Sequence, residues 1–300
     1  MRKDTHQSRA MVAKNMTMDT IDRTTIDYQN YRFGRSRQRF RGPKPNLSKP
    51  YVAFIGGSET YGRFVSEPYP QLVQEQIDLT CANWGTPGAG PSFFLKDPAV
   101  LEACSAAQVC VISVMGAVSM SNRLYSVFKR RNARLRSTSE MLEALYPKMD
   151  FSEFRFAHNM LHRMYRSNPD NFRVVEMEIQ QAWVARMREL MEDIETARVL
   201  VWMSTRSPDE GCSPDQRESF VTPPAFVTRE MLEKVAPMAD MVVEYVPGAE
   251  AAAEIAGGGV SDENQVAEPV LRYPGQMMHR QLADILAEPI KNVLDLDAPV

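Results

Sequence analysis

Five short apolar runs, each ended by glycine or another turn-forming residue, most constrain what this sequence can fold into. They are YVAFIGG (51–57), TCANWG (80–85), QVCVISVMG (108–116), RVLVWMS (198–204) and ADMVVEYVP (239–247). Strands that are apolar on both faces are typical of a parallel sheet covered on both sides. The runs therefore predict one parallel sheet of about five strands.

Segments with helical patterns separate these runs. They cover 68–77, 228–237, 274–286 and a long stretch over about 151–196, which Ser-Asn-Pro at 167–169 divides in two. Alternation of strands and helices predicts a three-layer α/β/α fold of the flavodoxin-like kind. We interpret 51–300 as a single domain with a helical insertion over about 124–196.

Composition excludes several classes of protein. With 44% hydrophobic and 24% charged residues in a chain of 300, neither a disordered nor a fibrous protein is expected. Four cysteines in no recognisable spacing predict neither a disulfide scaffold nor a metal site. There is no apolar run long enough to cross a membrane, and the first fifteen residues contain no signal-like segment. We expect a cytoplasmic protein without a membrane partner, cofactor or metal.

The positive charge is concentrated near the N-terminus. Residues 1–50 hold 12 Lys and Arg against 4 Asp and Glu, whereas the remaining 250 hold 23 against 34. Basic residues interleaved with Tyr31, Phe33 and Phe40 are compatible with binding to nucleic acid or anionic lipid. The alternative is a basic arm, partly disordered, that packs against the acidic body. We favour this second interpretation and expect no nucleic-acid partner.

The first candidate site follows the first strand. In α/β sheets ligands bind beyond the carboxyl ends of the strands, where Gly56–Gly62 reads GGSETYG. Ser58 is a candidate nucleophile or ligand, and Thr60 a candidate ligand, unless both only cap backbone groups. The spacing of Gly57 and Gly62 also fits the start of a phosphate-binding loop, but Arg63 and Phe64 replace its lysine and hydroxyl residue.

The second candidate loop is NWGTPGAG (83–90), which follows the second strand. Its three glycines can present N–H groups to a developing oxyanion. A tight structural turn is the alternative interpretation.

Together these loops resemble the blocks GDSxxxG and NxGxxG of the SGNH (GDSL) hydrolase superfamily, over roughly 51–290. The resemblance implies that Ser58 is the nucleophile and that the N–H groups of Ser58 and Gly88 line an oxyanion hole, with Asn83 in the second block. The runs YVAFIGGSETYG, MSNRLYSVFKRRNARL and DFSEF are closer still to an uncharacterised bacterial family, a domain of unknown function, which implies no activity.

The chain departs from the superfamily pattern at four positions. Gly57 replaces the aspartate before the serine, and Val118 replaces the asparagine of the third block. Ser119 or Asn122 could supply that donor only through a rebuilt loop. Aligning the last block with Arg272–Gly275 puts Val270 in the place of the aspartate and Tyr273 in the place of the histidine. A serine without a base is a weak nucleophile at neutral pH.

Other histidines could supply the missing base. His279 lies two turns into the last predicted helix and is a candidate base, although it could also cap or pack there. His158 and His162 are four residues apart, a spacing that can bind metal, but the sequence HNMLH lacks the glutamate of the HExxH motif. We expect that pair to face solvent.

A basic segment follows the third strand, with six cationic side chains between 123 and 136. Arginines there could bind a phosphate, sulfate or carboxylate group, and Arg123 is the preferred contact because it is closest to the strand end. The alternative is a solvated helix whose cations pair with Glu140 and Glu143.

Three functions remain open. The first is a hydrolase or acyltransferase in which Ser58 attacks the acyl ester of a small molecule or carbohydrate. The second is a binding protein for an anionic or saccharide ligand; its candidate ligand-binding residues are Gly57, Thr60, Asn83, Ser119, Asn122, Arg123 and Tyr273. Phosphoryl or sulfuryl transfer is a weaker third. An imidazole or carboxylate within reach of the Ser58 hydroxyl favours the first, and its absence favours the second.

Overall fold

The computed structural model describes residues 26–128, 131–211, 217–256 and 273–296. Its strands are, in chain order, β1 Tyr31–Arg32, β2 Arg39–Phe40, β3 Tyr51–Ile55, β4 Thr80–Asn83, β5 Val109–Ser113, β6 Tyr125–Phe128, β7 Arg131–Thr138, β8 Ala197–Met203, β9 Met241–Tyr245, β10 Ile255–Ala256 and β11 Tyr273–Pro274. Five of them form one sheet in the order β4-β3-β5-β8-β9, and all neighbours in it are parallel. Each predicted apolar run forms one of these strands.

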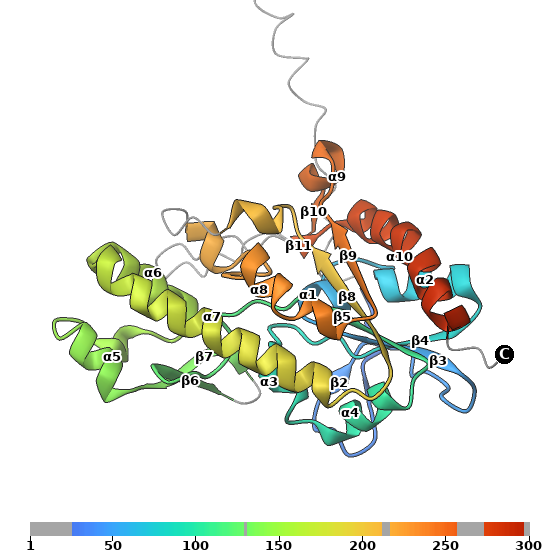
Figure 1. The fold of residues 1–300 in the computed structure, drawn as a ribbon, viewed down its shortest axis with the longest axis horizontal. Helices are drawn as coiled ribbons and strands as arrows, with labels where there is room; N and C mark the ends of the chain where they lie inside the picture. The colour runs from blue at the N-terminus through green and yellow to red at the C-terminus, as the bar shows by residue number, and fades with distance from the viewer. Residues whose placement is uncertain (1–25, 129–130, 212–216, 257–272, 297–300) are drawn as a thin grey trace, which may run out of the picture.

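The helices lie on both sides of this sheet (Figure 1). They are α1 Ser58–Tyr61, α2 Tyr69–Ile77, α3 Pro91–Phe94, α4 Pro98–Ser105, α5 Glu140–Leu145, α6 Ala157–Ser167, α7 Pro169–Glu192, α8 Arg229–Glu233, α9 Ala249–Ala253 and α10 Gln276–Leu296. Short 3-10 turns, η1 to η4, cover Phe151–Glu153, Pro208–Glu210, Arg217–Phe220 and Ala236–Met238.

Successive residues of the central strands face opposite layers. In β3, Ala53 and Ile55 belong to the larger apolar core, which also includes residues of α3, α4 and α7. Val52 and Phe54 belong to a second core with residues of α2 and α10. Because both faces of the strands are buried, their sequences are continuous apolar runs rather than alternating ones. The predicted three-layer α/β/α fold is confirmed.

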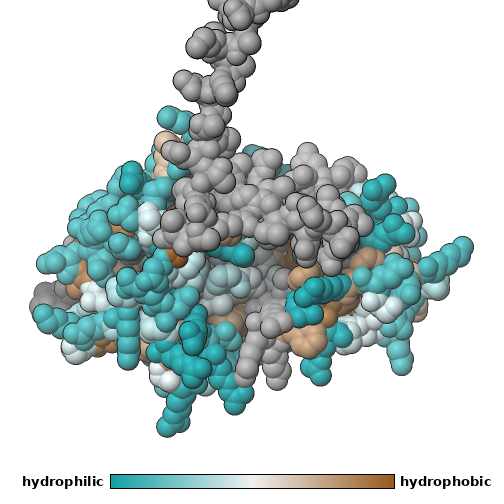
Figure 2. Space-filling view, turned by 180° about the vertical axis from the view of Figure 1, so that it is seen from behind, coloured by the Kyte–Doolittle hydropathy of each residue, from teal (hydrophilic) through white to brown (hydrophobic). Residues whose placement is uncertain are grey.

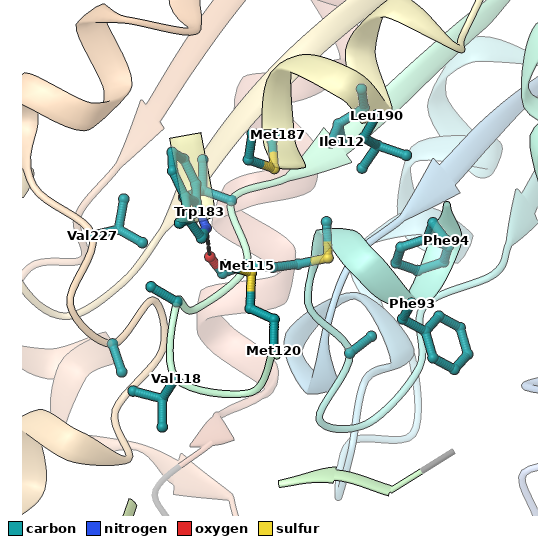
Figure 3. Close-up of a cluster of buried hydrophobic side chains, with 14 of the residues drawn as sticks. Phe93, Phe94, Ile112, Met115, Val118, Met120, Trp183, Met187, Leu190 and Val227 are labelled. Carbon is teal, nitrogen blue, oxygen red and sulfur yellow. Dashed lines mark hydrogen bonds between the residues drawn. The ribbon is translucent and has the colours of Figure 1, made fainter. Parts of the chain in front are cut away.

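The long helix α7 contributes buried side chains to the larger core (Figure 3). Trp183, Met187 and Leu190 are wholly buried, and the Trp183 indole N–H donates to the Met115 carbonyl at 2.7 Å. The predicted break at 167–169 is also present, because α6 ends at Ser167 and the Asn168 side chain caps α7 by accepting from the Asn171 N–H at 3.0 Å.

The segment from 124 to 138 differs from the predicted helical insertion, because β6 and β7 form an antiparallel hairpin there. Tyr125 and Val127 are buried, whereas Ser126 is half-buried and Phe128 is 46% exposed, which is the two-residue period of a strand. The cluster of cations hides this alternation in the sequence. The solvated helix considered for the basic segment is therefore wrong. Within the predicted helical insertion, the first helix is α5.

The described part of the basic arm, from residue 26 onward, packs on the body of the protein. Phe40 is completely buried, and the ring of Phe33 lies 4.9 Å from that of Trp84. Residues Tyr31–Arg32 and Arg39–Phe40 pair as a short hairpin. Residues 1–25 of the arm, including His6, lie outside the described residues.

Arg41 fixes this arm to the loop that follows β3. Its side chain is 5% exposed, and its guanidinium donates to four backbone carbonyl groups. The acceptors are Tyr61 at 3.3 Å, Gly62 at 2.6 Å, Val65 at 3.0 Å and Ser66 at 2.5 Å. These carbonyls end α1 and the turn after it, where helical partners are missing. Arg41 therefore takes the place of the next helical turn.

The surface seen in Figure 2 is mostly hydrophilic, and apolar side chains show only in small groups. In the described parts of the chain, no helix is both long enough and apolar enough to cross a bilayer.

Replacement of Arg41 should test its role. Arg41→Met keeps the length of the side chain but removes a donor from four carbonyl groups, three of them on buried residues, and we expect a loss of about 3 kcal/mol in the free energy of unfolding. Urea denaturation at pH 7 measures the change. Arg39→Met, which removes an exposed cation two residues away, is the control and should cost little; equal losses would contradict the argument.

Candidate functional site

The candidate site lies where the parallel strands end, around the short helix α1. Ser58 is the first residue of α1, directly after β3 and the Gly56-Gly57 turn. It is 9% exposed, and its hydroxyl makes no hydrogen bond within the described chain. The Ser58 and Gly88 N–H groups likewise have no acceptor among the described residues. Ser58 is thus held in place by its backbone and is not engaged by a base there.

The second loop is built by Asn83. Its Nδ2 donates to the Thr60 carbonyl at 2.8 Å, and its Oδ1 accepts from the Gly85 N–H at 2.9 Å. A Cβ on Gly85 would lie only 2.3 Å from the Tyr61 nitrogen, so the loop touches the backbone of α1 directly. Gly88 adopts a φ of +71° with open space around it. The predicted site residues Ser58, Thr60 and Asn83 are therefore brought together, with Asn83 as a brace between the loops.

Glu59 is the functional candidate that sequence reasoning missed. It is 3% exposed, and its carboxylate turns back to accept from the Gly57 N–H at 3.0 Å and the Ser113 hydroxyl at 3.3 Å. Burial raises its pKa, only partly offset by these hydrogen bonds. No ion pair joins it to a cation in the described chain. The signal that could have found it was a carboxylic acid in the short turn directly after a buried strand, next to the candidate nucleophile.

The position of the Glu59 carboxylate requires a residue without a side chain at position 57. A Cβ on Gly57 would lie 2.8 Å from both carboxylate oxygens of Glu59. The aspartate found before the serine in the SGNH pattern would therefore compete with Glu59 for the same space. In this chain the carboxyl group comes from the residue after the serine instead of the residue before it.

Thr60 has a structural partner. Its hydroxyl is wholly buried and lies 3.0 Å from the Tyr69 hydroxyl. Burial raises the pKa of Tyr69. Thr60 therefore joins α1 to α2 in the interior.

His279 is packed in the interior as a neutral side chain. It is 0% exposed, its ring stacks on Tyr69, and its Nδ1 accepts from the Tyr69 N–H at 3.1 Å. Burial lowers its pKa to about 3, and the charge of Arg41 adds to this effect. Its Nε2 has no hydrogen-bond partner in the described chain. In this structure His279 packs and caps the start of α2, the alternative that its place in the last helix suggested.

The polar side chains of the loop after β5 make hydrogen bonds within the protein. The Asn122 Oδ1 accepts from the Leu124 and Tyr125 N–H groups at 2.8 and 3.0 Å, which forms a turn. Arg123 donates to Glu178 from its backbone N–H at 2.9 Å and from its Nε at 2.7 Å, and its guanidinium also forms an ion pair with that carboxylate. Ser119 is half-buried on the same loop. Arg123, the preferred anion contact, thus already has a carboxylate partner within the fold.

Tyr273 lies close to α1 although it is more than two hundred residues away in the chain. It is 8% exposed, and its hydroxyl accepts from the Arg63 guanidinium at 3.0 Å. The same guanidinium lies 5.1 Å from the centre of the Tyr273 ring. Tyr273 is therefore in contact with the loop after α1. Val270 lies outside the described residues.

A cavity of about 240 Å³ opens beside α1. Its lining combines carboxyl, hydroxyl and apolar groups and consists of Glu59, Met203, Ser204, Thr205, Thr222, Pro223, Ala252, Glu254, Tyr273, Pro274 and Met278. Ser58 is not among these residues, but its neighbour Glu59 is. Neither Thr205 nor Thr222 uses its hydroxyl in a hydrogen bond within the described chain. Among the described residues that line it, two carry carboxyl groups and none is Lys, Arg or His.

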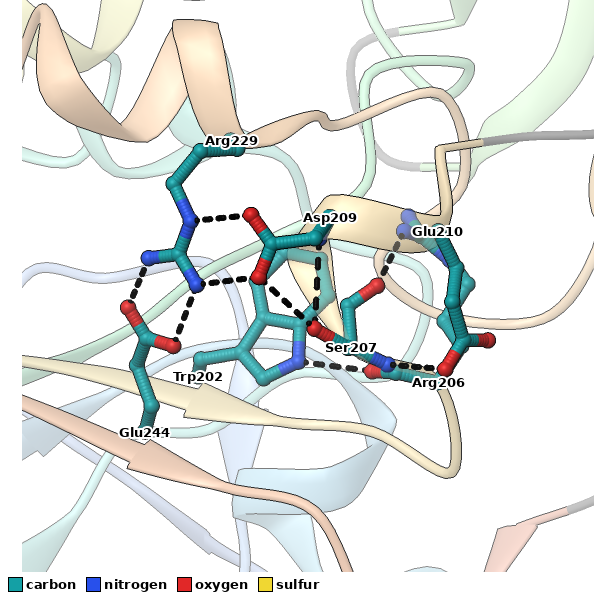
Figure 4. A network of polar contacts seen from close by, with 7 residues as sticks. All are labelled: Trp202, Arg206, Ser207, Asp209, Glu210, Arg229 and Glu244. Atoms are coloured by element: carbon teal, nitrogen blue, oxygen red, sulfur yellow. Dashed lines mark hydrogen bonds and ion pairs between the residues drawn. The ribbon is translucent and has the colours of Figure 1, made fainter.

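The loop after β8, which carries the cavity residues Ser204 and Thr205, is followed by a polar network (Figure 4). Arg229 bridges Asp209 and Glu244, with its Nε 2.9 Å from Asp209, and holds the pKa of Asp209 at about 2. The Trp202 indole donates to the Arg206 carbonyl at 3.0 Å. The Ser204 hydroxyl donates to the Pro223 carbonyl at 3.0 Å. The loop after β8 is therefore held in place where it meets the cavity.

The histidine pair on α6 is occupied by ring contacts. His158 stacks on Phe156 with ring centres 5.5 Å apart, and His162 meets Phe220 edge to face at 5.4 Å. Both rings are half-buried rather than fully solvent-facing. Among the described residues there is no group of three or more His, Cys, Asp or Glu side chains placed to hold a metal ion.

One protein family matches nearly the whole chain. The profile of a family described as "Domain of unknown function (DUF6473)" matches residues 16–294. The chain belongs to this family. No curated protein matches it.

Several solved structures are similar to this DUF6473 chain at low sequence identity. It is similar to a GDSL-like lipase from Bacteroides thetaiotaomicron at 11% identity, covering 85% of this chain and 92% of that one, with a TM-score of 0.31. A possible lipase from Chitinophaga pinensis shows 13% identity over 82% and 99% of the two chains, with a TM-score of 0.38.

A third similar structure is a two-domain esterase active on acetylated mannans. It shows 13% identity and a TM-score of 0.41, over 84% of this chain and 52% of that one.

His279 gives a prediction for the pH dependence of stability. Its pKa falls from about 6.5 in the unfolded chain to about 3 in the fold, so only the unfolded state gains a proton as the pH drops below 6.5. Stability is therefore lost as the pH falls through this window, by about 2 kcal/mol between pH 7 and pH 5. In His279→Asn, whose amide oxygen can still accept from the Tyr69 N–H, this share of the loss should vanish in denaturant titrations. An unchanged slope would contradict the assignment.

Gly85 gives a second prediction. Gly85→Ala would force a methyl group against the backbone of α1 and should destabilise the protein by about 1–3 kcal/mol. Gly248→Ala, where a Cβ meets nothing within 4 Å, is the matched control. Thermal unfolding of both variants tests whether the second loop rests directly on α1.

Proposed function

We propose that this DUF6473 protein uses the cavity beside α1 to bind a neutral, hydroxyl-rich ligand of the saccharide class, without a serine–histidine dyad. The observation that carries the proposal is the state of Ser58 and His279. The Ser58 hydroxyl has no base among the described residues, and His279 is buried and neutral with its Nδ1 already in use. Loss of the base from such a constellation costs several orders of magnitude in rate.

The lining of the cavity supports a hydroxyl-rich ligand over an anionic one. Arg123 is paired with Glu178, and no cationic side chain is found among the described residues that line the cavity. Thr205 and Thr222 offer hydroxyl groups without internal partners, and Tyr273 offers part of an aromatic ring. The Glu59 carboxyl group also lines the cavity, where its oxygens can hydrogen-bond to a ligand hydroxyl.

A second candidate function is ester hydrolysis or acyl transfer at Ser58. It is favoured by the free Ser58 and Gly88 N–H groups and by the place of Ser58 at the start of α1. These are the donors that an oxyanion hole requires. This candidate needs a base for Ser58, which the described residues do not supply.

Fluorophosphonate labelling distinguishes the two functions. We expect the native protein to show no label on Ser58 above the level of Ser58→Ala, under conditions that label a control serine hydrolase. Mass spectrometry of the digested protein locates any label. Label on Ser58 that disappears on heat denaturation would overturn the binding proposal in favour of an activated serine.

Binding is tested by calorimetry and thermal shift with neutral manno- and gluco-oligosaccharides as probes. A ligand bound only by the folded state raises the melting temperature. We expect Thr222→Val, which removes one hydroxyl from the lining, to weaken binding about two- to tenfold. Thr80→Val, at the amino end of β4, is the control. Failure of every probe, or equal weakening by both variants, would contradict the proposed cavity.

A further inference from the structure

A separate cavity lies between the turn of the β1–β2 hairpin and the loop that joins α3 to α4. It has a volume of about 290 Å³ and is lined by Arg35, Ser36, Arg37, Gln38, Phe93, Lys96, Asp97 and Pro98. Three of these residues are cationic and one is acidic. It shares no lining residue with the cavity beside α1.

The turn that carries the two arginines is firmly placed. The Ser36 hydroxyl donates to the Asp97 carboxylate, and both residues are 9% exposed. The Ser36 oxygen also accepts from the Gln38 N–H at 3.1 Å. One carboxylate oxygen of Asp97 is therefore already used within the fold, and the geometry of the turn does not depend on a ligand.

The arginines around this turn lack acidic partners. Arg35 and Arg37 are exposed, and neither forms an ion pair within the described chain. On the same hairpin Arg32 and Arg39 lie directly opposite each other across the strand pair. Like charges in such a pair destabilise a sheet by mutual repulsion. No acid of the described chain forms an ion pair with either of them, so the hairpin beside the cavity carries uncompensated positive charge.

We propose that this cavity is a binding site for a tetrahedral oxyanion group, a phosphate or a sulfate, held by Arg35, Arg37 and Lys96. Guanidinium groups donate to such oxygens in pairs, and the ammonium group adds a point charge. The remainder of the protein is acidic, since residues 51–300 hold 23 Lys and Arg against 34 Asp and Glu. The cationic cavity therefore stands out from its surroundings as the place for an anion.

The hairpin favours a single oxyanion over a nucleic acid or a membrane surface. Its aromatic rings are used internally, with Phe33 against Trp84 and Tyr31 against Phe40 at 4.9 and 6.3 Å between ring centres. They are therefore not free to stack on bases. None of the exposed large apolar side chains of the described chain lies on this hairpin, so nothing there can insert into a bilayer.

Calorimetric titration of the full chain with inorganic phosphate, pyrophosphate and sulfate at low ionic strength tests the site. We expect saturable binding, and we expect the double variant Arg35→Gln/Arg37→Gln to weaken it about tenfold or more. The control is Arg163→Gln/Arg188→Gln, which removes the same charge from exposed arginines on α6 and α7. The relative affinities of the three anions show which oxyanion the site prefers.

Two results would overturn the site. One is the absence of saturable binding by all three anions in the wild-type protein. The other is equal weakening by both double variants, which would mean a general charge effect. Binding of a single-stranded oligonucleotide or of anionic phospholipid vesicles without any binding of the three anions would likewise replace the oxyanion site with a polymer or membrane surface. Circular dichroism of each variant confirms that the fold is kept.

Discussion

The turn after β3 is the constraint on which the rest of the site depends. A helix of only four residues, α1, cannot hold its own position, because most of its backbone groups lack helical partners. Three outside contacts replace them. Arg41 donates to the carbonyls at its end, Asn83 binds the Thr60 carbonyl, and Gly85 allows the second loop to touch its backbone. Together they fix the direction of Ser58 and Glu59 without any ligand.

This construction decides which polar groups reach the cavity. With Gly57 before the serine, the Glu59 carboxyl group folds back beneath the turn and reaches Ser113 and the cavity. The buried imidazole of His279 sits between α10 and α2, where it accepts a backbone N–H in place of a serine proton. The polar groups that would form a catalytic dyad are thus distributed over structural contacts, and the cavity keeps hydroxyl and carboxyl groups that suit binding.

The sequence was sufficient to predict the sheet because burial on both faces leaves continuous apolar runs at the central strands β3, β5 and β8. The edge strands β4 and β9 are only partly buried, and their shorter apolar runs still marked them. It was not sufficient for the hairpin from 124 to 138, since six cations masked the alternation of Tyr125 and Val127. The meeting of the loops at Ser58 and Asn83 followed from their place after parallel strands. The role of Glu59 could not be predicted in this way. It depends on the burial of the carboxyl group, which is set by the distant loops after β5 and β8.

The arginines show most clearly where sequence reasoning ends. Arg41 and Arg35 lie six residues apart in one basic stretch, yet the first is buried against carbonyl groups and the second faces solvent. Arg123, from the other basic segment, is paired with an acid on α7. A guanidinium can serve as a brace, an ion-pair partner or an anion ligand, and the local sequence is similar in each case. Which role applies is decided by the acceptors that the fold brings near, so the arginines left without an acceptor are the ones available to a ligand.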